Sequence, residues 1–177
     1  MKMKKVKDKR FKYYISWMIE KYGVTESYIN QELEIWKNKF NSARSPESDF
    51  IWSMFNRIIN ELPNATSDLE KLYSEQRNIY QKMMEFLQEE GSNFSHVLKS
   101  MHYCNLLRWQ NSSYLSEIVI HAADCCDNCK ELDEKSLSLE KAMEYQYLPN
   151  SKCTRYSCIC FYSVRAIRDE RGRLIMK

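Results

Sequence analysis

The sequence predicts a mainly α-helical fold, with an N-terminal domain of about five helices and a small C-terminal β module. Through roughly the first 110 residues, apolar side chains recur at steps of three and four, the period of a helix that buries one face. After residue 112 the pattern changes to the alternation expected of short strands. With only 3 Gly and 3 Pro, the chain lacks the composition of long loops or disorder, so these segments should fold.

Turn-forming and capping residues divide the helical region. Gly23 is expected to end the first helix, and Thr25 to cap the second. Ser45 and Pro46 have the N-cap and first-turn preferences of a third helix, which Pro63 is expected to end. The apolar stripes of these three helices run from Phe11 to Tyr22, from Ile29 to Phe40 and from Ile51 to Leu62.

The fourth and fifth helices are predicted in the same way. Ser67 and Glu70 have the spacing of a capping box at the start of the fourth helix, and Gly91 is expected to close it. A fifth helix over residues 94–107 leads to the polar break QNSS. The aromatic and methionine side chains of these helices follow the helical period, so we interpret them as core residues rather than as a ligand site.

Three segments after residue 112 predict the β module. SEIVIHAA is expected to be a strand, SLSLEKAMEYQY a short helix or turn, and CICFYSVRAI a returning strand. RDERGRLIM is expected either to close a hairpin through Gly172 or to be a loose tail. The predicted domains are therefore a helical domain at 1–112, a small module at 113–165, and a basic tail or terminal hairpin strand at 166–177. Because a sheet this small buries little surface, the module needs an additional cross-link to be stable.

The cysteines of the module can supply such a cross-link. The chain has 7 Cys, and structural disulfides are rare in the reducing cytoplasm where we expect it. A C-x2-C pair is followed, after a gap, by C-x4-C-x-C, and zinc prefers four thiolate or imidazole ligands in a tetrahedron. The sequence therefore predicts a Zn²⁺ site. The predicted ligands are Cys126, Cys129, Cys153 and Cys158, with Cys160 as the substitute for Cys158, and Cys125 and His121 stand close by.

Catalytic alternatives are weaker. C-x2-C is also the spacing of a redox dithiol, but that hypothesis gives the later cysteines no role and needs a βαβ start. A zinc-knuckle nuclease needs a histidine base, and His121 is the only histidine of the module. His96 and His102 share a helix face near Cys104, without a carboxylate or serine at a convincing spacing. We therefore predict no catalytic residues and no enzymatic activity.

The stretch AADCCDNCKELDEKSLSLEKAMEYQYLPNSKCTRYSCICFYSV resembles the C-terminal zinc-binding module of phage minor head, or head-morphogenesis, proteins and of related bacterial and phage proteins. The likeness spans about residues 24–165, including FIWSMFNRIINE, and the chain has Glu134 where that family usually has Gly. The residues that match the family pattern are Cys126, Cys129, Leu132, Lys135, Ala142, Leu148, Pro149, Cys153, Cys158 and Cys160. The resemblance implies a zinc site and a phage-related or prophage-related role.

Positive charge is concentrated at the two ends of the chain. Residues 1–12 carry seven Lys or Arg and one Asp, and residues 152–177 carry seven Lys or Arg and two acidic residues. Basic ends can bind phosphates, dock on the acidic middle of the chain, or keep the protein in solution. A nucleic-acid-binding zinc protein is therefore the alternative function. Its candidate residues are Arg155, Arg165, Arg168, Arg171 and Arg173.

The sequence thus predicts a non-enzymatic, zinc-binding interaction protein. A protein partner is expected, either a phage structural protein or a host protein, with nucleic acid as the alternative. No apolar run approaches the roughly 20 residues that cross a bilayer, so we expect no membrane partner. The expected location is the cytoplasm, and the resemblance adds association with a virion as the alternative.

Overall fold

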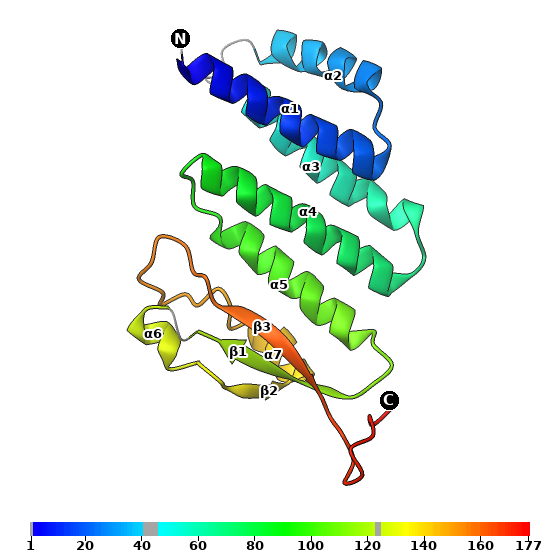
Figure 1. Cartoon of the computed structure of the whole chain (residues 1–177), viewed down its shortest axis with the longest axis vertical. Helices are drawn as coiled ribbons and strands as arrows, with labels where there is room; N and C mark the ends of the chain where they lie inside the picture. The colour runs from blue at the N-terminus through cyan, green and yellow to red at the C-terminus, as the bar shows by residue number, and fades with distance from the viewer. Residues whose placement is uncertain (1, 41–45, 123–124) are drawn as a thin grey trace. The chain divides into compact units, whose positions relative to one another are not determined.

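The computed structural model describes residues 2–40, 46–122 and 125–177 (Figure 1). These residues form seven helices and three strands, and the strands make a small antiparallel sheet after the five long helices, which confirms the predicted fold class. The chain divides into two compact units, Met1–Glu61 and Leu62–Lys177. Among the described residues, no helix combines the length and apolarity needed to cross a membrane.

The first unit contains α1 (Lys2–Tyr22), α2 (Glu26–Lys39) and most of α3 (Pro46–Ala65). Gly23 ends α1 as predicted: its φ is 67°, and its N–H donates to the carbonyl of Ile19 at 3.0 Å. Thr25 caps α2, because its hydroxyl accepts from the backbone N–H of Tyr28 at 3.2 Å. The predicted cap Ser45 lies outside the described residues.

Pro63 does not end α3, contrary to the prediction. The helix continues to Ala65 with Pro63 inside its last turn. The φ of proline suits a helix, and its missing N–H removes a single hydrogen bond at this point, so the last turn tolerates it. The prediction was wrong by two residues because a proline near a helix end weakens the helix without forcing it to stop.

Aromatic rings form the core of the first unit. Tyr14 and Phe55, on α1 and α3, pack edge to face with ring centroids 5.8 Å apart. Trp36 of α2 lies 6.3 Å from the ring of Phe50. Both phenylalanines are at most 2% exposed, so these rings are core residues as predicted, whereas Phe40, at the end of the second predicted stripe, is 37% exposed.

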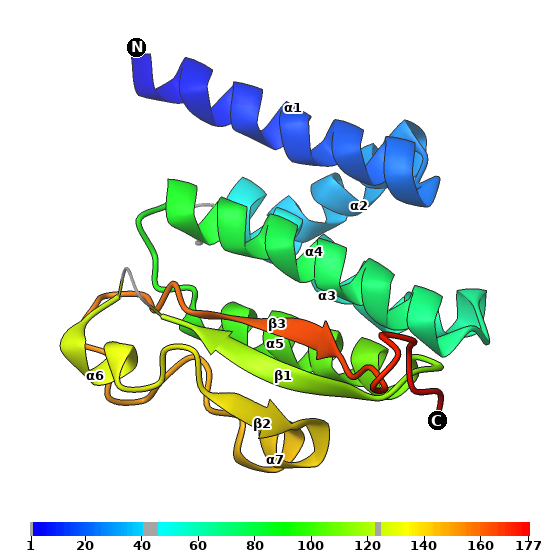
Figure 2. The same ribbon diagram turned by 60° about the horizontal axis from the view of Figure 1, so that its bottom comes forward.

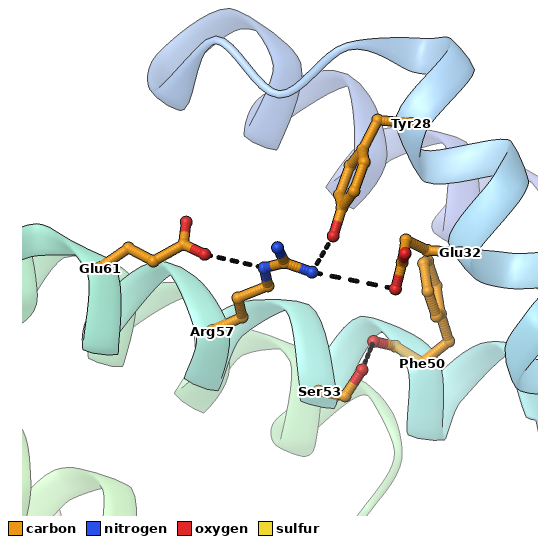
Figure 3. A network of polar contacts seen from close by, with 6 residues as sticks. All are labelled: Tyr28, Glu32, Phe50, Ser53, Arg57 and Glu61. Atoms are coloured by element: carbon orange, nitrogen blue, oxygen red, sulfur yellow. Dashed lines mark hydrogen bonds and ion pairs between the residues drawn. The ribbon is translucent and has the colours of Figure 1, made fainter.

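A polar network joins α2 to α3 at the surface of this unit (Figure 3). The guanidinium of Arg57 donates to the hydroxyl of Tyr28 and lies over its ring, 4.9 Å from the centroid. The same guanidinium pairs with Glu61 at 2.8 Å and with Glu32 at 3.8 Å. Because Tyr28 and Glu32 are one helical turn apart, a single arginine bridges two positions of α2.

The second unit begins with the end of α3 and the pair α4 (Leu69–Glu89) and α5 (Ser95–Gln110). Asp68, and not the predicted Ser67, caps α4: its carboxylate accepts from the N–H of Lys71 at 3.1 Å. A carboxylate at the N-terminus also has favourable charge for the helix dipole, which explains the shift by one residue. Gly91, with φ 67°, follows the end of α4 as predicted.

The sheet consists of β1 (Ser116–His121), β2 (Ser136–Ser138) and β3 (Phe161–Ala166) in the order β2-β1-β3. Ile118 is opposite Leu137 of β2 and Val164 of β3. Short helices α6 (Asp127–Lys130) and α7 (Leu139–Tyr145) complete the unit, and Figure 2 shows α5 behind the sheet. The sequence predicted β1, α7 and β3, but β2 was missed because three residues are too short for a pattern.

α5 and the sheet share one hydrophobic core. Leu98, Leu106 and Trp109 of α5 belong to the same buried cluster as Ile118 and Ile120 of β1. This cluster also contains four of the cysteines, Cys125, Cys129, Cys158 and Cys160. The compact unit around the sheet therefore includes helices that the sequence placed in a separate domain at 1–112. Whether residues 1–112 fold independently of the module stays a prediction.

The C-terminal residues form the predicted turn. Gly172 has φ 76°, and Arg168 pairs with Leu174 in an antiparallel bridge across it. The Nζ of Lys177 donates to the carbonyls of Trp109 and Gln110, at 3.2 and 2.7 Å. Of the two alternatives for this segment, the structure therefore has the hairpin and not the loose tail.

Glu134 has a backbone conformation that normally requires glycine. Its φ is 55°, and its N–H donates to the carbonyl of Ile120 at 2.9 Å, which fixes the turn before β2. Its carboxylate lies 3.2 Å from Nδ1 of His121, but the side chain is 65% exposed, so this pair contributes little. The turn thus keeps a geometry suited to glycine although the residue is Glu.

We expect Glu134→Gly to raise the free energy of unfolding by about 0.5–1 kcal/mol. The left-handed conformation costs a non-glycine residue about 1–2 kcal/mol, from which the greater entropy of glycine in the unfolded chain is subtracted. Urea denaturation measures the change. The control is Glu131→Gly in the same connection, where φ is −59° and glycine should be destabilising. Equal destabilisation by both changes would contradict the argument.

Candidate metal centre

Six cysteines converge at one end of the sheet. Cys125 and Cys126 directly precede α6, and Cys129 lies within it. The other three, at 153, 158 and 160, lie in the loop between α7 and β3. Figures 1 and 2 both show α6 beside that loop, so two segments far apart in sequence meet here. All seven cysteines of the chain are free thiols.

The sulfurs form two overlapping groups, in each of which all four Sγ atoms lie within 4.8 Å of one another. We name these groups the first and the second quartet. The first quartet is Cys125, Cys126, Cys129 and Cys153, and the second quartet is Cys125, Cys129, Cys158 and Cys160. The cluster can therefore hold a metal ion.

Distances within the first quartet match tetrahedral coordination. The Sγ of Cys126 lies 3.6 Å from that of Cys129 and 3.8 Å from that of Cys153, and Cys125 and Cys153 are separated by 3.9 Å. Four sulfurs at the Zn–S distance of about 2.3 Å would stand about 3.8 Å apart. These three pairs thus already have the spacing that a four-thiolate ion imposes.

A local hydrogen bond favours the thiolate form of one of these side chains, that of Cys126. The backbone N–H of Thr154 donates to Sγ of Cys126 at 3.4 Å and lowers the pKa of that thiol to about 6. Nδ2 of Asn150 also donates to Sγ of Cys129 at 3.5 Å, but burial raises the pKa of that thiol. Burial has the opposite effect on Cys153 and raises its pKa to about 11. A cation bound here would therefore have to displace the protons of the thiols whose pKa is raised.

Asparagine side chains connect the two cysteine segments. Nδ2 of Asn150 donates to the carbonyl of Asn128 in α6 at 3.0 Å, and Nδ2 of Asn128 donates to the carbonyl of Lys152 at 2.9 Å. These bonds hold the loop against α6 by polar contacts that lie outside the sulfur cluster. Such supporting bonds orient the ligands of a metal site.

His102 supports the cluster from α5. Its Nε2 lies 3.1 Å from the carbonyl oxygen of Cys160, and its ring packs edge to face on Tyr162 at 5.2 Å. Burial lowers the pKa of His102 to about 4, so the ring is neutral near pH 7 and its Nε2–H donates to the carbonyl. The sequence found no catalytic set for this histidine, and in the structure it is a buried packing residue, whereas His96 is exposed.

His121 belongs to neither quartet. Its Nε2 lies 2.7 Å from the hydroxyl of Ser163, and its ring stacks on that of Phe161 with centroids 4.8 Å apart. It also lines a cavity of about 340 Å³ beside Cys125 and Cys160. Both ring nitrogens are thus engaged by other side chains, since Nδ1 faces Glu134.

The two quartets divide the ligands that the sequence predicted. Cys126, Cys129 and Cys153 fall in the first quartet, whereas Cys158 falls in the second, together with its predicted substitute Cys160. Cys125 belongs to both quartets but was not among the predicted ligands. The sequence did contain a signal for Cys125, its position directly before Cys126. A rule based on the spacing of one C-x2-C pair does not use that position.

The arginines proposed for nucleic acid are exposed, and each of them interacts with groups within the chain. Arg165 pairs with Glu117 at 3.0 Å, and Arg173 with Asp169 at 2.8 Å. The guanidinium of Arg168 donates to the carbonyl of Gly172 at 2.7 Å. The backbone N–H of Arg171 donates to the carboxylate of Asp169 at 2.9 Å, and Arg155 also interacts within the chain. The structure thus gives several of these side chains a role in the terminal hairpin and the sheet.

The described residues therefore offer one dense cluster of soft ligands, with buried thiols drawn from two segments of the chain. Thiolates at this spacing suit a soft divalent cation in tetrahedral geometry. Comparison of the chain with protein-family models, with curated proteins and with solved structures finds no match.

Proposed function

We propose that this protein is a non-enzymatic interaction protein whose C-terminal region is held together by zinc. The observation that carries the proposal is the sulfur spacing in the first quartet, where three of the pairs are 3.6–3.9 Å apart and all four sulfurs lie within 4.8 Å of one another. A complete thiolate shell leaves no open position on the ion for water or substrate, which is the mark of a structural rather than a catalytic zinc site. The ion would join α6 to the loop before β3.

A protein partner is supported by the surface around the cysteines. Tyr156, Ile159 and Phe161 flank the last two cysteines, and their side chains are 66%, 49% and 52% exposed. A metal site fixes the backbone that presents them, so they form a preorganised apolar surface. The resemblance of the cysteine-containing segment to the C-terminal module of phage minor head proteins supports a partner in virion assembly.

Elemental analysis of the full chain tests the zinc proposal. Protein purified under reducing conditions, without added metal, is expected to contain at least one zinc per chain, because the cysteines would acquire it during expression. A metal-free chain with a Cys126–Cys129 disulfide would instead support the redox dithiol hypothesis. Portal and capsid genes beside this gene, and co-purification with their products, would support the virion role.

Nucleic-acid binding is the competing function, and salt dependence distinguishes it. We expect only weak, sequence-independent binding that disappears near physiological salt, because Arg165, Arg168 and Arg173 already contact groups of the chain. Replacing these three and Arg171 together by Ala should flatten the salt slope in a binding titration. Tight binding at physiological salt that this variant abolishes would favour the nucleic-acid function.

A further inference from the structure

Cys125 and Cys129 belong to both quartets, so each of them could bridge two ions. A single ion in the first quartet would leave Cys158 and Cys160 uncoordinated, and a single ion in the second would leave Cys126 and Cys153 uncoordinated. Either choice uses four of six sulfurs that the fold has gathered. Two separate four-ligand sites would need eight sulfurs, so both quartets can be filled at once only by sharing.

Both shared residues are buried, as bridging ligands can be. Cys125 is 5% exposed and Cys129 is fully buried, whereas Cys126 and Cys153, which belong only to the first quartet, are half-buried. A thiolate that contacts two cations has its charge compensated most completely, so it tolerates burial best. Cys158 and Cys160, which belong only to the second quartet, are also buried, at 2% and 1% exposed, so burial is compatible with bridging by the shared pair without singling it out.

Charge does not oppose a second ion. One divalent ion with four thiolates carries a net charge of about −2. A second divalent ion adds two positive charges and requires only two further thiolates, so the net charge of the cluster is unchanged. The hydrogen bonds from Thr154 and Asn150 to Cys126 and Cys129 face that remaining negative charge.

We propose that the six cysteines bind two Zn²⁺ ions, one in each quartet, with the thiolates of Cys125 and Cys129 bridging them. The proposal rests on the zinc site proposed above and extends it from one ion to a binuclear cluster. Each side chain that is still a thiol releases its proton to solvent when it coordinates, and no oxidant or reductant takes part. Cys104, buried in α5 and in neither quartet, takes no part.

Metal stoichiometry tests this directly, on the full chain purified under reducing conditions from zinc-supplemented medium. About two zinc per chain are expected. One per chain would overturn the binuclear cluster and leave the zinc site standing, whereas none would overturn both. Replacement of zinc by Co²⁺ tests the bridges: the electron paramagnetic resonance signal should grow up to one equivalent and fall towards two, because bridging thiolates couple the two ions. A signal that grows steadily to two equivalents would exclude the bridges.

Variants assign each ion to its quartet. Cys126→Ser removes a ligand of the first quartet alone and Cys160→Ser a ligand of the second alone, so each should bind about one zinc per chain. Cys104→Ala is the matched control and should keep two. If Cys160→Ser keeps the wild-type zinc content, the second quartet does not bind an ion and the proposal is wrong. Circular dichroism of each variant confirms that the helices are present.

Discussion

Removal of the metal is expected to unfold the sheet and the cysteine loops of the second unit while the first unit, Met1–Glu61, stays helical. Four cysteines lie in the same hydrophobic core as β1 and α5, so loss of the proposed ions would leave buried thiols without a cation. It would also weaken the connection between α6 and the loop before β3, which the hydrogen bonds of Asn128 and Asn150 would then have to hold without the metal. Structural zinc contributes about 10–16 kcal/mol in zinc-finger peptides, and a whole domain is stable by only about 5–15 kcal/mol. If the cluster binds zinc as proposed, the metal is therefore expected to decide whether this part folds.

Limited proteolysis of the full chain, with and without a chelator, measures this effect. Chelation should expose cleavage sites after residue 112 and in α5, whose face packs on the sheet, and should leave residues 1–61 protected. Adding zinc back should restore protection, and reductant alone should change nothing. An unchanged cleavage pattern would show that the second unit folds without metal, and cleavage within the first unit would show that the units depend on each other.

His102→Ala is expected to lower the free energy of unfolding by about 3 kcal/mol. The change removes the donor to the carbonyl of Cys160, at 3.1 Å in the native structure, and leaves that carbonyl buried without its partner. It also opens a cavity beside Tyr162, against which the imidazole packs. Both losses act next to a cysteine of the second quartet, so they weaken the link between α5 and the metal site.

Urea denaturation in the presence of zinc measures the cost of this change. His96→Ala on the same helix is the control: His96 is exposed, so its loss should change stability by less than about 0.5 kcal/mol. His102→Gln retains an N–H donor and should recover part of the loss. If His102→Ala and His96→Ala have equal effects, the contact with Cys160 does not stabilise the fold.

Helix boundaries were predictable where one residue had a single physical reason to be there. Gly23 and Gly91 both adopt a positive φ that other residues avoid, and Thr25 supplies the cap that its position demanded. Predictions failed where two residues could serve, as with Ser67 and Asp68. The prediction also failed at Pro63, because the loss of one backbone hydrogen bond at this proline is compensated by the rest of α3.

The cysteine cluster was predictable in kind but not in membership. Spacing along the chain identifies C-x2-C as a turn that can present two sulfurs. It cannot show how the loop carrying Cys153, Cys158 and Cys160 folds back, because that depends on contacts such as those of Asn128 and Asn150 with the opposite segment. The role of Cys125 in both quartets likewise follows only from three-dimensional proximity.

The origin of the ligands in two segments has a consequence for synthesis of the protein on the ribosome. Roughly thirty residues separate Cys129 from Cys160, so at about 5–20 residues per second the first three thiols wait about 2–6 s for the last one. All of the first unit has been translated before Cys125, so it can fold during this interval. Zinc supply and oxidants in the cell at that moment should therefore affect the yield of the second unit far more than that of the first.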